Sequence, residues 1–349
     1  MRALRRLRPP AQAAGVTLTM NHISPSAAVA ASLRDLQATI AISAPNGAEI
    51  AEQLRQLAPQ VRARLLSEPV DVGDAELLIT WYLNDALRAS MPALRLVQAN
   101  GAGVDGILRG MQGLSGPEAP AVCRTVDPHL VEGMSAYVAW AVLDHLKEMP
   151  LYRAAQATRS WAQRGARHPA SHRVGIAGAG ELGLTSARAL AGLGFPTRTW
   201  SRSDRPATDS RVQHFAGHAA LGAFLQDLDC LVCLLPLTPD TRGFLGAPVF
   251  GALARGAHVI NVGRGEHLMD TPLLEALDSG QLGRATLDVA TVEPLPADHA
   301  FWAHPGVVLT PHIAARAAAT SVASQALANL RSLREGRPLT HRVDPAQGY

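Results

Sequence analysis

Two residues that could take part in carbonyl chemistry follow apolar runs that are typical of buried strands. Arg264 lies in the segment Asn261–Gly265, and His312 comes directly after Thr310 and Pro311. Reduction of a 2-oxo acid needs a cation that holds the carboxylate, a hydride donor and an acid that protonates the developing alkoxide. Arg264 and His312 could supply the cation and the acid, and a bound nicotinamide the hydride. Taken singly, an arginine or a histidine in such a loop is more often structural.

A glycine-rich turn supplies a candidate site for the nicotinamide cofactor. Gly178, Gly180 and Gly183 form G-x-G-x-x-G directly after an apolar run, and a helical pattern begins at Leu182. The first glycine permits a tight turn, the second lets the backbone approach a pyrophosphate, and the third allows close packing of helix on strand. The positive end of the helix dipole then faces the phosphates. Glu181 does not fit a pyrophosphate site, because its carboxylate would repel the phosphates unless the side chain points away.

The end of the next predicted strand bears on the choice of cofactor. An NAD site usually places an acidic residue there, which binds the ribose 2′-hydroxyl. This chain has Ser201, Arg202 and Ser203 in that region, and Asp204 comes too late. Because a guanidinium matches the geometry of a phosphate, Arg202 favours NADPH over NADH, with NAD as the less favoured cofactor. In the alternative interpretation, Arg202 is a solvated loop residue.

These residues need a frame of parallel strands, and the sequence contains two α/β series that could provide it. In the first series the predicted strands are Thr39–Ser43, Glu76–Trp81 and Leu94–Ala99, and the predicted helix is Ala48–Leu57. The last of these strands ends in a glycine-rich turn from Gly101 to Asp105. Ligands of open α/β sheets bind at the carboxyl ends of the strands, so this turn is a second candidate binding segment.

The second series follows a long helix. The apolar, proline-free segment Leu130–Lys147 predicts that helix, which we expect to stop at Pro150, and Tyr152–Ala170 is irregular or weakly helical. Predicted strands then follow at Arg173–Ala177, Thr197–Trp200, Cys230–Leu235, His258–Val262, Arg284–Val289 and Val307–Thr310. Six strands after one glycine-rich turn suggest a complete dinucleotide-binding sheet. The final helix, about Ala315–Glu335, lies beyond this sheet and could return to pack on the first lobe.

Composition excludes several classes of protein. The chain has 349 residues, of which 47% are hydrophobic and 17% charged, so it can bury a sizeable core and is not intrinsically disordered. Its length exceeds one ordinary core and indicates two lobes. No apolar run approaches the roughly 18 residues of a membrane span. The formal net charge is only +3, and the one dense arginine cluster lies at the extreme N-terminus, so we expect neither a nucleic-acid nor a membrane partner.

The three cysteines bear on the compartment and on metal binding. Cys123, Cys230 and Cys233 cannot form a disulfide framework in a chain of this length, which fits a reducing cytoplasm. Cys230 and Cys233 have metal-like spacing, but they lie within an apolar strand on which positions i and i+3 face opposite sides. No second pair accompanies them, so we expect buried core cysteines and no metal site.

Seven motifs together give the chain a family resemblance, and they follow one another in a specific order and spacing. They are Gly101–Asp105, Gly178–Gly180, Trp200–Ser203, Leu235–Thr238, Asn261–Gly265, Glu293–Pro296 and Pro311–His312. With them the chain, from about Ala38 to its C-terminus, resembles the D-isomer-specific 2-hydroxyacid dehydrogenase family and, within it, the glyoxylate/hydroxypyruvate reductase A-like branch.

The resemblance implies an α/β fold of two lobes. One lobe would be a Rossmann dinucleotide-binding domain at residues 125–311, and the other a flavodoxin-like substrate (catalytic) domain at residues 38–124 and 312–349. Residues 1–37 would form an N-terminal extension, for which we expect disorder. The family is usually dimeric through the long helix, which implies a homodimer with Tyr137 and Trp140 packed there. One departure from the family is Ser135–Ala136, where the long helix often carries a glutamate.

The resemblance also implies roles for individual residues. Arg264 would bind the substrate's carboxylate and carbonyl oxygen, and His312 would be the acid of reduction, with Glu293 fixing its tautomer. Asp288 would orient the nicotinamide carboxamide. The substrate would further contact Trp81, Gly101, Ala102 and Gly103. The implied cofactor-binding residues are Gly178, Gly180, Glu181, Leu182, Gly183, Ser201, Arg202, Ser203, Leu235, Pro236, Leu237, Val262, Gly263 and Asp288.

The expected activity is NADPH-dependent reduction of a small 2-oxo acid, either glyoxylate to glycolate or hydroxypyruvate to D-glycerate. One alternative is a D-lactate-type or bulkier 2-oxo acid reductase, which the size of the pocket near Trp81 would decide. The other alternative is a non-catalytic NAD(P)-sensing scaffold that resembles transcriptional corepressors of this fold. The presence of Arg264, Glu293 and His312 counts against a scaffold.

Overall fold

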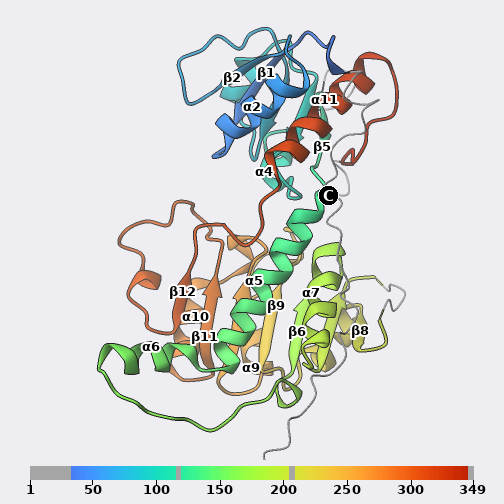
Figure 1. Cartoon of the computed structure of the whole chain (residues 1–349). Coiled ribbons are helices and arrows are strands. Elements are labelled where there is room, and N and C mark those ends of the chain that lie inside the picture. Colours follow the sequence, from blue (N-terminus) through green and yellow to red (C-terminus); the bar gives the residue numbers. More distant parts are fainter. Residues whose placement is uncertain (1–32, 115–118, 204–208, 345–349) are drawn as a thin grey trace, which may run out of the picture.

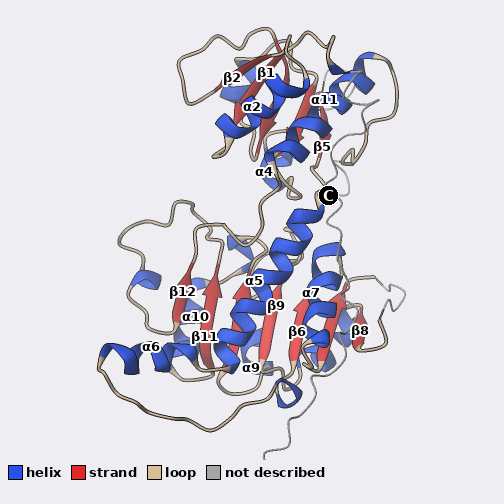
Figure 2. Ribbon diagram, in the orientation of Figure 1, coloured by secondary structure: helices blue, strands red, loops and turns tan. Residues whose placement is uncertain are grey.

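The chain folds into two lobes, each built on one parallel β-sheet that helices cover (Figure 1, Figure 2). The computed structural model describes residues 33–114, 119–203 and 209–344. This arrangement confirms the predicted two-lobed α/β fold.

The sheet of the first lobe has five parallel strands in the order β2-β1-β3-β4-β5. This is the strand order of flavodoxin-like sheets, as the sequence predicts. The strands are β1 (Thr39–Ser43), β2 (Arg62–Leu65), β3 (Ala75–Thr80), β4 (Leu96–Ala99) and β5 (Ala121–Cys123). The helices of this lobe are α2 (Gly47–Leu57), α3 (Asp85–Ala89), α4 (Asp105–Arg109) and α11 (Ala319–Arg334).

Alternating side chains give this sheet two apolar faces. Ile40 and Ile42 on β1 belong to the core that α2 and α11 cover, whereas Ala41 between them belongs to the core on the opposite face. The helix α11 therefore returns to the first lobe, as predicted. Leu33 and Leu36 also lie in the α2–α11 core, with 1% and 8% of their surface exposed. The ordered lobe thus begins before residue 38, where the sequence placed its start, and residues 1–32 of the expected extension lie outside the described residues.

The sheet of the second lobe has seven parallel strands in the order β12-β11-β10-β9-β6-β7-β8. If β6 is taken as strand 1, the order read from β8 is 3-2-1-4-5-6-7. This is the Rossmann order 3-2-1-4-5-6 with β12 added as a seventh strand. The strands are β6 (Val174–Ala177), β7 (Thr197–Ser201), β8 (Val212–Ala216), β9 (Cys230–Cys233), β10 (Ala257–Asn261), β11 (Leu282–Leu287) and β12 (Val307–Leu309).

Helices cover both faces of the second sheet. They are α5 (Pro128–Leu146), α6 (Met149–Ala157), α7 (Glu181–Gly192), α8 (Leu221–Leu225), α9 (Ala247–Ala252) and α10 (Asp270–Asp278), with short 3-10 helices η1 (Pro169–Ser171), η2 (His218–Ala220), η3 (Gly265–His267) and η4 (Ala300–Trp302). Cys230 lies in the core on the α5–α7 face and Cys233 in the core on the opposite face. Both are fully buried, so the structure confirms the core interpretation of the pair.

The chain crosses between the lobes twice, before α5 and after β12 (Figure 1). Buried Asp127 ties the two crossings together. Its side chain accepts a hydrogen bond from the backbone N–H of His129, which caps α5, and another from the N–H of Ala318 at 2.6 Å. One carboxylate therefore fixes both the start of α5 and the approach to α11.

Two local expectations are corrected. The long helix α5 ends at Leu146, before Pro150 as expected, but the stretch after it begins with the helix α6. Pro150 lies in the first turn of α6, where the missing N–H of a proline is not needed. The sequence patterns also gave no signal for β2, β5 and β8. β2 and β8 are edge strands and β5 has only three residues, so none of them shows a long apolar run.

Candidate active site

The glycine-rich turn after β6 lies where the second sheet reverses its strand order, between β6 and β9. Ligands of such sheets bind at this position. Gly178 has a φ of +117°, and an added Cβ there would lie 2.4 Å from the carbonyl oxygen of Leu234. A Cβ on Gly183 would lie 1.8 Å from the carbonyl oxygen of Gly178. A Cβ on Gly180 would meet no atom within 4 Å, so the first and third glycines are required by packing and the second leaves open space at the start of α7.

The neighbouring predicted cofactor residues lie along the same edge of the sheet. Glu181 is exposed in the first turn of α7, and its expected repulsion of a phosphate stays a prediction. Leu235, Pro236 and Leu237 follow β9, and Val262 and Gly263 follow β10. The fold therefore brings these segments to the edge at which a dinucleotide would lie.

The end of β7 carries no acidic side chain. Ser201 donates a hydrogen bond from Oγ to the carbonyl oxygen of Ser203, at 2.7 Å. The side chain of Arg202 is 62% exposed, and its guanidinium lies 3.9 Å from the carboxylate of Asp240. Such an exposed ion pair is weak, so the guanidinium is free to turn toward an anion beside Ser201.

Arg264 is where the two lobes meet. Its Nε donates to the carboxylate of Asp105 in the first lobe at 2.7 Å, and its Nη1 donates to the carbonyl oxygen of Gly263 at 2.7 Å. A Cβ on Gly103 would lie only 1.5 Å from Nη2 of Arg264. The glycine-rich turn of the first lobe and the predicted substrate-binding arginine are therefore in direct contact.

His312 is held by side chains from two other segments. Its Nδ1 lies 2.9 Å from Oε2 of Glu293, and its ring meets Trp81 edge-on with centroids 4.8 Å apart. Its φ of +53° is in the left-handed region, so the tertiary structure must hold this backbone. Trp81 follows β3, and it brings the first lobe onto the predicted acid.

The charge of Glu293 fixes the role of each ring nitrogen. Burial alone would raise the pKa of Glu293, but the hydrogen bonds from His312 and from the N–H of Ala290, together with the charge of Arg264, lower it. An ionised carboxylate only accepts hydrogen bonds, so Nδ1 of His312 carries the donated proton. Nε2 is then the ring nitrogen that can exchange a proton with a substrate.

Asp288 contributes in a way the sequence did not suggest. Its buried carboxylate accepts hydrogen bonds from Thr310 Oγ1 at 2.6 Å and from the N–H groups of Ile313 and Ala314 at 2.8 and 2.9 Å. The three donors, Thr310, Ile313 and Ala314, lie on both sides of His312 in the sequence. In this structure, Asp288 therefore holds the histidine loop, and the predicted contact of Asp288 with a nicotinamide carboxamide stays a prediction.

Tyr137 extends this network to the long helix α5. Its hydroxyl lies 2.5 Å from Thr310 Oγ1. Because Thr310 donates its only hydroxyl proton to Asp288, the proton between Tyr137 and Thr310 comes from the tyrosine. Burial raises the pKa of Tyr137 to about 12, which keeps that proton in place. The sequence predicted only packing for Tyr137, and it gave no sign of the roles of Thr310 or Asp105, because these contacts join residues far apart in the chain.

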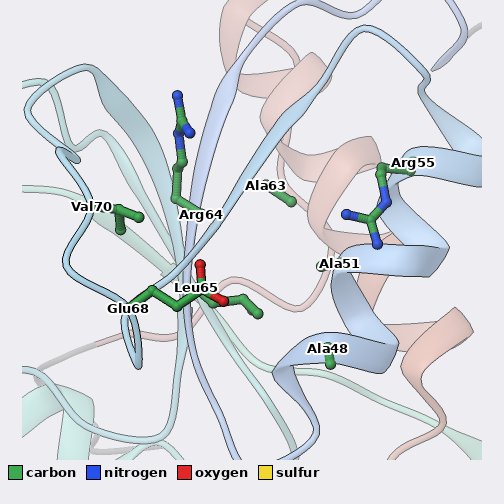
Figure 3. Close-up of a pocket in the computed structure, with 8 residues that line it drawn as sticks. All are labelled: Ala48, Ala51, Arg55, Ala63, Arg64, Leu65, Glu68 and Val70. Atoms are coloured by element: carbon green, nitrogen blue, oxygen red, sulfur yellow. The ribbon is translucent and has the colours of Figure 1, made fainter.

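Other features do not compete for the site. The cavity in Figure 3, of about 200 Å³, lies between α2 and β2 in the first lobe, and none of the predicted site residues lines it. Within the described ranges, no group of three or more histidine, cysteine, aspartate or glutamate side chains could hold a metal ion. In the same part of the chain, no helix is long and apolar enough to cross a membrane.

Comparison with known proteins decides the family. The family model described as D-isomer specific 2-hydroxyacid dehydrogenase, NAD binding domain, matches residues 139–314. A glyoxylate/hydroxypyruvate reductase A of Serratia proteamaculans is 38% identical over 306 residues, which cover 87% of this chain and 97% of the relative. The chain belongs to the D-isomer specific 2-hydroxyacid dehydrogenase family.

Solved structures of this dehydrogenase family share the fold. A family protein of Klebsiella pneumoniae is 38% identical with a TM-score of 0.81, and the match covers 89% of this chain and 99% of the other. An NADPH-dependent glyoxylate/hydroxypyruvate reductase of Sinorhizobium meliloti, solved with NADP and sulfate, is 35% identical with a TM-score of 0.81, covering 90% and 100%. As a dehydrogenase of this family, the chain places Arg264, Glu293 and His312 at the edge of its Rossmann sheet.

Proposed function

We propose that this dehydrogenase reduces small 2-oxo acids with NADPH, converting glyoxylate to glycolate and hydroxypyruvate to D-glycerate. The observation that carries the proposal is the position of His312, which is paired with Glu293 and packed against Trp81. The charge of Arg264 acts on the same Glu293 and helps to lower its pKa. The names of the relatives in Serratia and Sinorhizobium support the same activity.

In the proposed mechanism, Arg264 binds the substrate carboxylate beside the glycine-rich turn of the first lobe, where its guanidinium packs against Gly103. The nicotinamide supplies a hydride to the carbonyl carbon when it is bound. His312 donates the proton of Nε2 to the carbonyl oxygen, and Glu293 stabilises the ring through Nδ1. Since Trp81 and Gly103 come from the first lobe and Arg264 from the second, the site is complete only with the lobes together.

The residues present fit a dinucleotide. Gly178 and Gly183 make the tight turn that brings the N-terminus of α7 to the edge of the sheet, and Gly180 leaves room for a pyrophosphate. Ser201 and Arg202 would receive the adenosine ribose, with Arg202 on a 2′-phosphate. Two relatives of known structure, from Sinorhizobium meliloti and Xanthobacter autotrophicus, were solved with NADP and NADPH, which supports this preference.

The contact between Trp81 and His312 favours a small substrate over a bulky one. A ring whose centroid lies 4.8 Å from the imidazole occupies space that a long side chain of a 2-oxo acid would need. For this reason we favour glyoxylate and hydroxypyruvate over the larger 2-oxo acids of the alternative interpretation.

The proposal extends to the domains, the assembly and the compartment. Residues 38–124 and 312–349 would act as the substrate domain and residues 125–311 as the cofactor domain. A homodimer would form over α5, α6 and the loop after them, where Trp140, Met149, Leu151 and Trp161 are 40%, 38%, 47% and 101% exposed. The three free, buried cysteines suit the reducing cytoplasm.

The test is a substrate panel with both reduced cofactors. Purified protein is mixed with NADPH or NADH and with glyoxylate, hydroxypyruvate, pyruvate or phenylpyruvate, and the absorbance of the reduced cofactor is followed. We expect fastest oxidation of NADPH with the two small acids. If no 2-oxo acid of the panel accelerates oxidation of either cofactor, the proposed reaction is wrong.

A further inference from the structure

Four charged side chains of alternating sign connect the two lobes beside the candidate site. Asp105 and Arg109 lie one turn apart on α4 of the first lobe, and Arg264 and Glu266 follow β10 in the second lobe. Arg109 Nη1 lies 3.0 Å from Glu266 Oε1, and Arg264 Nε lies 2.7 Å from Asp105 Oδ1. Arg109 Nη2 lies 3.7 Å from Asp105 Oδ2, which closes the series Glu266, Arg109, Asp105, Arg264.

The series determines how the guanidinium of Arg264 is oriented beside the glycine-rich turn of the first lobe. Nε of Arg264 is used by Asp105, and Nη1 by the carbonyl oxygen of Gly263. Nη2 is the nitrogen that lies against Gly103 in the glycine-rich turn of the first lobe. The bond to Asp105 therefore orients the guanidinium so that Nη2 faces the turn.

Arg109 balances the two carboxylates on either side of it. The side chain of Glu266 is only 12% exposed, and that of Asp105 only 20%, whereas Arg109 is 58% exposed. A carboxylate with so little contact with water needs a cation nearby. Without Arg109, Glu266 would be left unpaired two residues from Arg264, and Asp105 would interact with Arg264 alone. Both changes reduce the positive potential that attracts an anionic substrate.

We propose that Arg109 and Glu266 are positioning residues, whose ion pair across the lobes holds Asp105 and so orients Arg264 for the substrate carboxylate. This inference rests on the proposed function, because it takes the substrate to be a 2-oxo acid bound by Arg264. The pair forms between lobes, so it also favours the lobe arrangement in which Arg264 faces Gly103. Its contribution is to affinity for the substrate anion, and the proton transfer at His312 does not depend on it.

Two single variants and their combination test the proposal. Arg109→Gln, Glu266→Gln and the double variant are compared with the unaltered protein for glyoxylate kinetics with NADPH and for binding of oxalate by calorimetry in the presence of NADPH. Oxalate is an anion of similar size, and its binding needs no turnover. We expect each single variant to raise KM and the oxalate Kd about 3- to 10-fold with kcat within about two-fold, and the double variant to match the singles, since they remove one interaction.

Controls separate a local role from general destabilisation. Arg62→Gln removes an exposed ion pair with Asp74 elsewhere in the first lobe and should leave KM and the oxalate Kd unchanged. Arg109→Lys keeps the charge and should recover part of the loss. Thermal denaturation shows which variants fold. If Arg109→Gln does not fold, the kinetics and oxalate binding of Glu266→Gln decide whether the ion pair has the proposed role. Unchanged oxalate binding in the single variants, or effects that add in the double variant, would overturn the proposal. If the unaltered protein binds oxalate but oxidises no NADPH, the proposed reaction fails, and the binding data still decide the role of the pair.

Discussion

The indole of Trp81 meets the imidazole of His312 edge-on, with the ring centroids 4.8 Å apart and the planes at 83°. Trp81 comes from the end of a strand in the first lobe, and His312 from the loop after β12 in the second sheet. One aromatic side chain thus both limits the space beside the proposed acid and joins the lobes there.

Replacing Trp81 by alanine should widen the site. We expect the ratio of kcat/KM for phenylpyruvate to that for glyoxylate to rise about 10-fold or more, because pocket volume discriminates substrates by amounts of this order. Steady-state kinetics with both substrates measure the ratio. Trp161→Ala is the matched control, since Trp161 is fully exposed in the loop after α6. An unchanged ratio in Trp81→Ala would show that this tryptophan does not set the substrate size.

Removal of the His312 imidazole should slow turnover with little loss of cofactor affinity. His312→Ala is expected to lower kcat by roughly 10² to 10⁴-fold, the usual share of general acid catalysis. His312→Asn is the companion variant, because asparagine tolerates the left-handed backbone that this residue adopts. Both variants should bind NADPH with an unaltered Kd in a fluorescence titration. Turnover close to that of the unaltered protein in either variant would refute the role of acid.

A methyl group at residue 103 should disturb the substrate-binding arginine. In Gly103→Ala the new Cβ would lie 1.5 Å from Nη2 of Arg264, so the guanidinium must move. We expect KM for glyoxylate to rise about 10- to 100-fold, the scale on which a shift of about 1 Å acts in an active site. Gly101→Ala adds the same group to the same turn with no atom within 4 Å, and it should raise KM far less. Equal effects of the two changes would place Arg264 outside substrate binding.

The exposed guanidinium of Arg202 should decide between the cofactors. Arg202→Asp replaces a cation with an anion where a 2′-phosphate is expected, so the ratio of kcat/KM for NADPH to that for NADH should fall about 10- to 100-fold, the value of a hydrogen bond to a charged group. Arg55→Asp on α2 of the first lobe makes the same change of charge far from the proposed cofactor and should leave the ratio as it was. A constant ratio in Arg202→Asp would remove this residue from phosphate binding.

Three neighbouring imidazoles should make stability fall in acid. The rings of His172 and His258 lie 5.4 and 4.8 Å from that of His145. Burial, followed by the charges of His172, Arg167 and Arg284, lowers the pKa of His145 to about 3, and burial also lowers the pKa of His172 and of His258. These histidines stay neutral in the fold.

In the unfolded chain the same histidines take up protons below pH ~6.5. The unfolded state thus binds more protons, so stability falls as the pH drops below about 6.5. For His145 the fall continues toward about pH 3 and amounts to up to roughly 1.4 kcal/mol per pH unit, and His172 and His258 add to it in the same direction. Thermal denaturation between pH 7.5 and 4.5 measures this. His145→Gln should give a shallower dependence, and His129→Gln, whose side chain is half exposed on α5, should leave the slope unchanged. A slope that His145→Gln does not alter would contradict this account.

The fold was largely predictable from apolar runs, and the parts that were not have physical reasons. Strands such as β6 and β9 are buried on both faces and read as continuous apolar segments. β2, with the sequence Arg-Ala-Arg-Leu, forms a sheet edge with alternating exposed residues, so its pattern is too short and too polar. Pro150 can follow the end of one helix or lie in the first turn of the next. Here it does both, and the local pattern shows only the first.

For the site, the sequence identified the groups but not how they are held. Arg264, Glu293 and His312 were recognisable because motifs in family order carry them. The bonds that orient them come from Asp105, Tyr137 and Thr310, and nothing in the sequence pairs Asp105 with Arg264 or Tyr137 with Thr310. Contacts of this kind join positions as far as 173 residues apart, as between Tyr137 and Thr310, and local patterns carry no information about them.

The return of α11 to the first lobe has a consequence for the order in which the protein is made. The seven strands of the Rossmann sheet have all been synthesised once Leu309 has been added, whereas the first lobe still lacks Ala319–Arg334, whose Val322, Ala326 and Leu330 are fully buried in its core. Domains generally fold as units during synthesis. The first lobe is therefore completed after the Rossmann sheet, and its apolar face stays uncovered until α11 has been synthesised.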